Sequence, residues 1–339
     1  MKKTFSNIVK LILALGLGIF IIWISLKDLT NLEKENIINS FKVADYSWVI
    51  YSIIIGIFSH LTRAIRWRML LKPMGYETSI YNSFLAVMIG YFANLGIPRS
   101  GELARCTVLY RQSKIPVDKS FGTVILERAI DMLMFFLLFV FAFFLEYKRI
   151  QEYVETRILS KISNKMDGLF ADYFILKVLI VIGIVMIIGY FLFRGKIKES
   201  AIVKKIVGVF KGIWEGLISI RKVERPGLFV FYSLLIWFFY YLMVYLTLYS
   251  LEETAHLGPG AGLSILVLGS IGIMVTPGGI GLYPVIVAET LTLYGIASNT
   301  GIGLAMGWIT WSAQTFMILA LGGISLIVVS IQNKAHVKS

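Results

Sequence analysis

The sequence predicts an all-α polytopic membrane protein with about six full spans and two re-entrant helical hairpins. Hydrophobic residues make up 57% of the 339 residues and charged residues only 16%, which is too little charge to cover a water-soluble globule of this size. The charged residues are also clustered, and the uncharged stretches between them are long enough to cross a bilayer. A disulfide scaffold is excluded because the single cysteine, Cys106, cannot pair within the chain.

Six stretches are long and apolar enough to be full spans. The first, 8–26, lacks a small-residue cleavage site, so we expect a retained span rather than a signal peptide. The others are 48–71, 121–145, 174–193, 228–251 and 302–331. At 1.5 Å per residue the last is about 45 Å long, against a hydrocarbon core of about 30 Å. It must therefore tilt or break, and Gly322 and Gly323 mark the expected break point.

Two further apolar segments do not fit a simple span. Residues 80–97 are followed by the sequence PRSGE at 98–102 and by a return limb that is too short and too charged to cross lipid. This pattern predicts a re-entrant hairpin buried against other helices. The second segment, 257–298, holds one charged residue and is interrupted by TPGGIG at 276–281. It is either a second hairpin or two full spans.

The distribution of positive charge predicts that both termini are cytosolic. Most of the 33 lysines and arginines fall in segments on one side of this arrangement, which the positive-inside rule assigns to the cytosol. The net charge of +13 therefore reports topology, and no nucleic-acid partner is predicted. Each half then holds three spans and one hairpin in opposite orientation, which indicates a possible inverted repeat of 1–150 and 173–339 within a single transmembrane domain, 1–339. The alternative is that any six-span chain with two irregular segments can be drawn in this way.

The linker at 201–222 has apolar residues on one helical face and lysines opposite, which predicts an interfacial amphipathic helix that attracts anionic lipid. A plain positively charged connector is the alternative.

Ionisable residues inside the predicted spans are the functional candidates, because they are costly to bury in lipid. Counted from the cytosolic ends, they converge on one layer, in which arginines outnumber carboxylates. Arginine forks suit phosphate geometry, so we predict a bound lipid phosphate. The predicted lipid-phosphate binding residues are Arg63, Arg66, Trp67, Asn94, Arg99, Arg105 and Arg128. The alternative is a buried ion-pair network that locks the hairpin to its neighbours.

Two further groups of residues are candidates for the transport machinery. The predicted ion-pair or coupling residues are Glu102, Glu127, Asp131 and Glu289. The predicted hairpin-tip residues are Pro98, Gly101, Pro277, Gly278, Gly279 and Gly281. Glycines let the backbone approach a ligand closely, and the helix that follows would direct its positive dipole at an anion.

No metal, cofactor or catalytic residue is predicted. The histidines, His60, His256 and His336, are far apart in the sequence, and no nucleophile with a plausible base emerges.

These motifs resemble the flippase-like integral membrane family named after the transmembrane region of lysylphosphatidylglycerol synthetase. The resemblance rests on RAIRWR at 63–68, on Asn94 with PRSGE and Arg105, on Glu127 and Arg128 with Asp131, and on PGGIG at 277–281. It implies a lipid-translocating membrane domain, fused in some members to a cytosolic aminoacyl transferase. Because this chain ends at Ser339 without such a domain, synthetase activity is not expected.

The chain departs from the family pattern at one position. Many relatives carry a glutamate shortly after the Gly-Gly-x-Gly motif, where this chain has Tyr283 and Pro284. If that glutamate serves coupling, its role is either lost here or taken by Glu289.

Together these features predict a flippase-like transporter that moves an anionic lipid or a lipid-linked phosphate carrier between the leaflets of the cytoplasmic (inner) membrane. Its expected partners are membrane lipids with anionic headgroups, and it is a possible homo-oligomer. A membrane-embedded lipid-modifying enzyme and a non-catalytic scaffold are the alternatives.

Overall fold

The computed structural model describes residues 29–97, 99–153 and 223–338, together with Trp23 and Lys27, and the regular structure in this part of the chain is entirely helical. The predicted hairpin residue Pro98 and nearly all of the predicted span 8–26 lie outside the described residues, as do the span 174–193 and the amphipathic helix 201–222. One compact unit comprises 1–145 and 219–339. A second unit, 146–218, contains the short helix α7 (Tyr147–Tyr153).

Four described helices are long and apolar enough to cross a membrane: α3 (Tyr46–Leu71), α6 (Val117–Leu145), α11 (Pro226–Leu248) and α15 (Ile302–Lys338). They coincide with four of the predicted spans. The expected break at Gly322 and Gly323 is wrong, because α15 continues through both glycines. A Cβ atom at Gly322 would lie 2.5 Å from Cβ of Phe92, so this glycine permits close packing of α15 on α4 rather than a kink.

Two pairs of shorter helices form the hairpins. The first pair is α4 (Ile80–Gly96) and α5 (Gly101–Ser113), and the second is α13 (Pro259–Val275) and α14 (Leu282–Thr292). At 1.5 Å per residue α5 and α14 are about 20 Å and 16 Å long, well short of the hydrocarbon core of about 30 Å. These lengths favour a hairpin over two full spans for 257–298.

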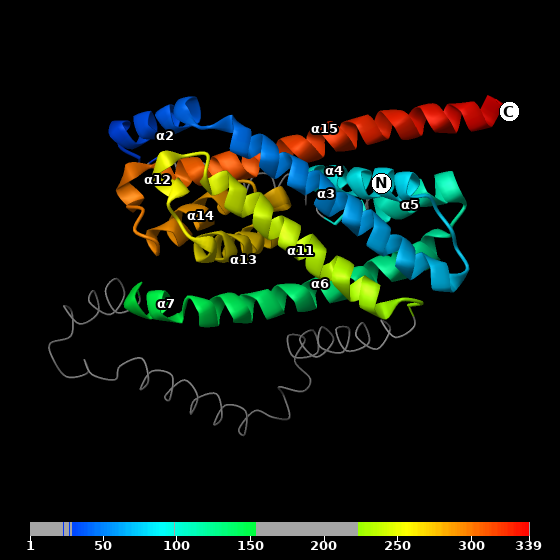
Figure 1. The fold of residues 1–339 in the computed structure, drawn as a ribbon. Coiled ribbons are helices and arrows are strands. Elements are labelled where there is room, and N and C mark those ends of the chain that lie inside the picture. Colours follow the sequence, from blue (N-terminus) through cyan, green and yellow to red (C-terminus); the bar gives the residue numbers. More distant parts are fainter. Residues whose placement is uncertain (1–22, 24–26, 28, 98, 154–222, 339) are drawn as a thin grey trace, which may run out of the picture. The chain divides into compact units, whose positions relative to one another are not determined.

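The same order of elements occurs twice along the described chain. A long helix, a hairpin and a second long helix appear as α3, α4–α5 and α6, and again as α11, α13–α14 and α15. Figure 1 shows the two hairpins toward opposite ends of this unit, and α3 and α11 run side by side between them. The inverted repeat of 1–150 and 173–339 and the orientation of each helix in a membrane stay predictions.

Hydrogen bonds between the turn and the end of α4 hold the first hairpin tip in place. The backbone N–H of Gly101 donates to Oδ1 of Asn94 at 2.8 Å, and the Ser100 hydroxyl donates to the carbonyl of Ala93 at 3.1 Å. A Cβ atom at Gly101 would overlap the carbonyl oxygen of Gly90, so only glycine lets α4 and α5 approach this closely.

The second hairpin tip contains the 3₁₀ turn η4 (Pro277–Gly279) and packs against the first. Gly278, Gly279 and Gly281 all have positive φ, with values of 59°, 77° and 75°. The carbonyl of Gly278 accepts a hydrogen bond from Nε1 of Trp311 at 2.7 Å. A Cβ atom at Gly278 would lie 2.8 Å from Cδ2 of Leu95 near the end of α4, so the two tips are in contact.

Short helices complete the described fold: α2 (Asn31–Val43), η1 (Lys72–Met74), α12 (Glu252–Ala255) and η5 (Ser298–Thr300). The α2 helix was not predicted. A capping box between Thr30 and Glu33 starts it, and Nδ2 of Asn36 donates to the carbonyl of Thr300 at 3.0 Å, which ties α2 to the segment before α15.

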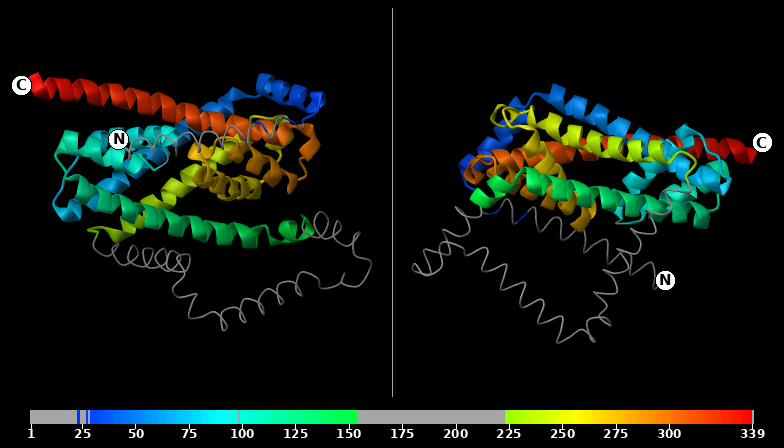
Figure 2. Two further views of the ribbon diagram at one scale, coloured as in Figure 1. Left: turned by 180° about the vertical axis from the view of Figure 1, so that it is seen from behind. Right: turned by 60° about the horizontal axis from the view of Figure 1, so that its bottom comes forward.

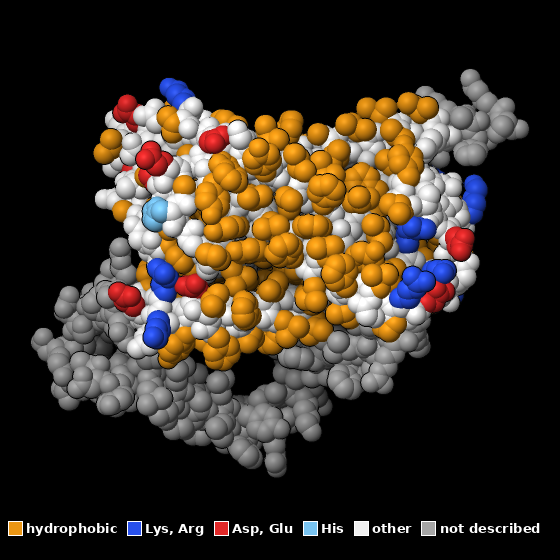
Figure 3. Space-filling view, in the orientation of Figure 1, with side chains coloured by type: hydrophobic (Ala, Val, Ile, Leu, Met, Phe, Trp, Pro, Cys, Tyr) orange, Lys and Arg blue, Asp and Glu red, His pale blue; other side chains and the backbone are white. Residues whose placement is uncertain are grey.

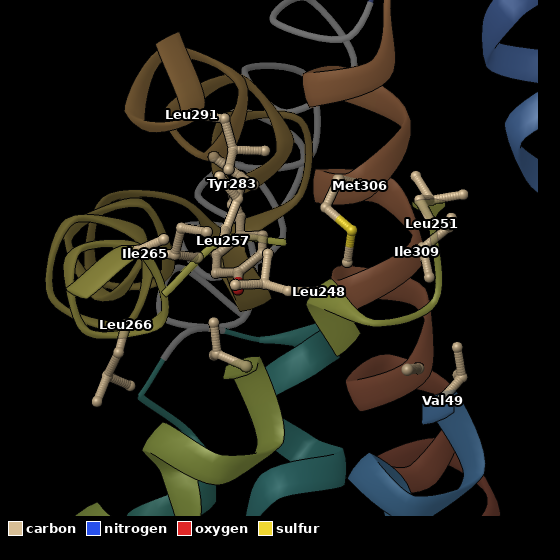
Figure 4. Close-up of a cluster of buried hydrophobic side chains, with 14 of the residues drawn as sticks. Val49, Leu248, Leu251, Leu257, Ile265, Leu266, Tyr283, Leu291, Met306 and Ile309 are labelled. Carbon is tan, nitrogen blue, oxygen red and sulfur yellow. The ribbon is translucent and has the colours of Figure 1, made fainter. Parts of the chain in front are cut away.

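The largest apolar core lies among α3, α11, α13, α14 and α15, and Figure 4 shows its central side chains, including Leu248, Tyr283 and Met306. Outside this core many large apolar side chains remain exposed, such as Phe136, Phe231 and Phe316. Figure 3 shows that on one face they form a continuous apolar area, with the charged side chains gathered toward its two ends. Figure 2 shows the same helices from two further directions. An apolar band between charged ends fits a helical bundle that spans a bilayer.

Candidate functional site: a buried charge cluster

Five ionised side chains meet inside the bundle and form what we call the charge cluster: Arg63, Arg66, Arg105, Glu127 and Asp131. Nη1 of Arg63 lies 2.6 Å from both Oε1 of Glu127 and Oδ2 of Asp131. Nη2 of Arg66 lies 2.7 Å from Oδ1 of Asp131, and Nη2 of Arg105 lies 3.0 Å from Oε2 of Glu127. All five residues are buried, and the three cations exceed the two anions by one charge.

Helix periodicity explains why these residues meet. Arg63 and Arg66 are three residues apart on α3, and Glu127 and Asp131 are four residues apart on α6, so each pair lies on one helical face. Arg105 comes from α5 and fixes the first hairpin to α6. The cluster therefore joins three helices through charge-assisted hydrogen bonds.

Polar residues that the sequence interpretation missed surround the charge cluster. The Tyr240 hydroxyl accepts from Nη2 of Arg63 at 3.0 Å, and the Ser233 hydroxyl accepts from Nη1 of Arg66 at 3.1 Å. Tyr91 lies 3.3 Å from Tyr240, hydroxyl to hydroxyl. These residues are uncharged and lie in apolar stretches, whereas the sequence prediction selected mainly ionisable residues within the spans. Their only sequence signal was the seven-residue spacing of Ser233 and Tyr240, which places both on one face of α11.

Trp67 lies next to the charge cluster and contacts Arg105. Its ring stacks under the Arg105 guanidinium, with Cζ 4.5 Å from the ring centroid, and its Nε1 donates to the Thr123 hydroxyl at 2.9 Å. The fully buried indole thus holds Arg105 in place by a cation–π contact.

The charge cluster keeps unused donors. Among the described residues, Nε of Arg63, Arg66 and Arg105 has no hydrogen-bond partner although it is buried in each case. Nδ1 of His60, which lies one turn before Arg63 on α3 and outside the charge cluster, is likewise buried without a partner in this part of the chain. His60 lies beside Tyr91, with ring centroids 4.5 Å apart. Buried N–H groups normally find an acceptor, so the layer could donate to a further anionic or polar group.

The other predicted site residues lie outside the charge cluster. Arg128 pairs with Glu102 at 2.8 Å in a partly exposed position, and Asn94 serves the first hairpin tip. Arg99 is exposed at that tip with a positive φ of 63°. Glu289 is exposed on α14. Pro277 and Gly278, Gly279 and Gly281 form the second tip.

Within the described residues, no group of three or more His, Cys, Asp or Glu side chains is arranged to hold a metal ion.

Comparison with known proteins identifies the family. The sequence model of the lysylphosphatidylglycerol synthase TM region matches residues 7–323. This chain belongs to that family. The predicted resemblance is therefore confirmed, and the chain is a membrane protein with several apolar helices.

Two curated relatives share part of this chain. UPF0104 membrane protein MJ1595 of Methanocaldococcus jannaschii is 34% identical over 102 residues, which cover 29% of this chain and 30% of that protein. Glycosyltransferase AglD of Haloferax volcanii is 28% identical over 103 residues, or 30% of this chain and 16% of that protein. The matched region thus spans less than a third of either relative. No solved structure matches.

Proposed function

We propose that this member of the family is a flippase-like transporter that moves an anionic lipid or a lipid-linked phosphate carrier between leaflets. The charge cluster carries the proposal. Three guanidinium groups face two carboxylates inside a bundle of apolar helices. An unbalanced buried cation is costly in a low-dielectric interior, and a phosphate anion would compensate it.

The contacts of Arg105 suggest how a headgroup would act. Arg105 connects the first hairpin to α6 through Glu127, and the phosphate of a lipid could replace this carboxylate because a guanidinium binds both groups in the same fork geometry. Arg63 and Arg66 would keep Asp131 as their partner. Exchange of Glu127 for phosphate would remove one of the ion pairs that join α5 to α6, while the pair of Arg128 with Glu102 would remain, and would couple headgroup binding to a loosening of the α4–α5 hairpin.

The cellular setting is part of the same proposal. We place the protein in the cytoplasmic membrane with both termini in the cytosol, as a single transmembrane domain built from two inverted repeats. Its partners would be lipids with anionic headgroups, and Glu289 would serve coupling if the transport step requires an acidic residue.

Reconstitution tests the proposal directly. The full chain is placed in phosphatidylcholine vesicles that contain a trace of fluorescent phosphatidylglycerol, and movement between leaflets is measured as accessibility to a membrane-impermeant quencher. We expect movement with the wild-type protein and at least a tenfold slower rate with Arg105→Gln, roughly the loss of one charged hydrogen-bonding partner. Lys34→Gln, which removes an exposed charge on α2, is the matched control. Absence of movement with phosphatidylglycerol and with a polyprenyl phosphate would reject the transporter.

Two other functions have specific support. The internal pairing within the charge cluster also fits a scaffold whose ion pairs only brace the helices, and a wild-type protein that moves no lipid would favour it. The name glycosyltransferase for one relative favours a membrane enzyme. Mass spectrometry of lipids incubated with the protein and a nucleotide sugar would detect a glycosylated product.

A further inference from the structure

A groove lies on the outside of the first hairpin. No residue of the charge cluster lines this groove, so the two sites are separate. Its volume is about 620 Å³, and its walls come from α4, the hairpin tip, α5 and α15. The lining residues are Ile89, Ile97, Arg99, Ser100, Leu103, Ala104, Thr107, Val108, Arg111, Leu326, Val329 and Ser330. We call it the α5–α15 groove.

The α5 wall is one continuous helical stripe. Its residues recur every three or four positions, from Ser100 through Ala104 and Thr107 to Arg111, while Arg105 on the opposite face enters the charge cluster. The α15 wall follows the same spacing from Leu326 to Ser330. The α5 helix therefore presents one face to the buried ion pairs and the other to the groove.

The groove has a cation at each end and an apolar wall between them. Arg99 lies at the hairpin tip and Arg111 in the last turn of α5, and both are exposed. Neither forms an ion pair with the described residues, in contrast to Arg63, Arg66, Arg105 and Arg128. The rise of α5 from Gly101 to Arg111 is about 15 Å, so the two arginines lie toward opposite ends of the groove.

The amide groups of Gln112 and Gln332 join the two walls beside Arg111. Nε2 of Gln112 donates to Oε1 of Gln332 at 2.8 Å. This bond ties α15 to α5 where the groove ends, so a bound molecule would enter from the side, past exposed Leu103.

We propose that the α5–α15 groove binds a membrane lipid that carries a phosphate in a negatively charged headgroup. The charge pattern commits the site to this occupant, because a guanidinium pairs with the phosphate while an acyl chain lies along Ile97, Leu103 and Leu326. Arg111 and Arg99 provide two successive phosphate positions along α5. The inference rests on the proposed function, since it gives the transported lipid class a second binding position on the protein, but binding can be measured without transport.

Photocrosslinking of the full chain tests the site. The protein is placed in phosphatidylcholine nanodiscs with a small fraction of phosphatidylglycerol bearing a diazirine on its acyl chain, and adducts are mapped by peptide mass spectrometry. We expect adducts on α5 and on 326–330 of α15. Replacing both Arg99 and Arg111 by alanine should lower their yield by at least about fivefold, since each cation contributes roughly 1 kcal/mol toward an anionic lipid and 1 kcal/mol corresponds to about fivefold in affinity. Lys119→Ala, an exposed charge outside the groove, should leave the yield unchanged.

Ala104→Phe provides a second variant that keeps every charge and fills the groove. It should abolish the adducts while the thermal unfolding midpoint stays near that of the wild type. Equal labelling by a diazirine phosphatidylcholine would overturn the proposal, as would loss of the adducts on adding inorganic phosphate, which would indicate a free-anion site. Arginine-dependent adducts without lipid movement would reject the transporter and retain the groove, whereas movement without adducts would reject the groove alone.

Discussion

Glu127 is the residue on which the charge cluster depends most. It is fully buried, accepts hydrogen bonds from Arg63 and from Arg105, and lies 3.6 Å from Nη2 of Arg66. Removing one partner of a buried ion pair leaves an uncompensated charge, which costs far more than the pair itself contributes.

Glu127→Gln should therefore destabilise the protein by about 3–5 kcal/mol, because three arginines would remain against Asp131 alone. The unfolding midpoint in detergent would report the change. Glu102→Gln is the matched control, since its pair with Arg128 is partly exposed and should contribute only about 0–1 kcal/mol. Equal effects of the two substitutions would contradict the assignment of Glu127 as the centre of the cluster.

Glu33 makes the start of α2 sensitive to pH. Hydrogen bonds from the Thr30 hydroxyl and backbone N–H hold the pKa of the Glu33 carboxyl below its ordinary value. Because this pKa is lower in the folded than in the unfolded chain, the stabilisation is complete above the unfolded pKa of about 4.3 and is lost as the pH falls through the folded pKa.

Hydrogen exchange of the α2 amides, corrected for intrinsic rates, should therefore show reduced protection below about pH 4. Glu33→Ala should have lower protection at neutral pH and no such step. A step that persists in the variant would assign the titration to another group.

At the scale of elements, the first hairpin depends on the close approach of α4 and α5 at Gly101. Gly101→Ala would press a Cβ atom against the Gly90 carbonyl and the Asn94 amide, so α5 would have to shift away from α4. We expect a destabilisation of about 1–3 kcal/mol, typical of overpacking. Thermal unfolding in detergent measures the loss.

Gly96→Ala, five residues earlier, is the control because a Cβ atom there meets nothing within 4 Å. It should be neutral or slightly stabilising, as alanine is the better helix former. A Gly101→Ala protein as stable as Gly96→Ala would show that the tip does not need this contact.

At the scale of the whole compact unit, the two hairpin tips meet at Leu95 and Gly278. If the tips separate during lipid movement, a short thiol-reactive cross-link between cysteines placed at Leu95 and Gly278 should stop transport, and a cleavable linker should restore it. Each single cysteine variant controls for the substitution itself, and Cys106 is buried. Undiminished movement in the cross-linked protein would show that the tips remain together.

The sequence predicted the apolar helices more completely than the partners of the charged residues. The length of the apolar stretches and the positions of the charged residues between them predicted α3, α6, α11 and α15, because both can be read directly from the sequence. Which arginine meets which carboxylate depends on the rotation of α3 against α6, a property of packing. Tyr240 and Ser233 were missed for the same reason.

The failed predictions have local causes. The glycine pair at 322–323 does not break α15, because Gly322 makes room for Phe92 and a helix in an apolar bundle keeps its hydrogen bonds where no alternative partner exists. The α2 helix was not predicted because its segment is polar, so that its capping box is the main sequence signal for it.

The length of α15 links the protein to the thickness of its membrane. Its apolar part, Ile302–Gln332, has 31 residues and is about 46 Å long, so it exceeds a hydrocarbon core of about 30 Å and must lean or extend into the headgroups. The same rigid helix supplies Leu326 and Val329 to the α5–α15 groove. Because α15 is held to α4 and α5, longer acyl chains would stand the bundle more upright and shorter ones would lean it further, so the chain length of the surrounding lipids would set the tilt of the protein in its membrane.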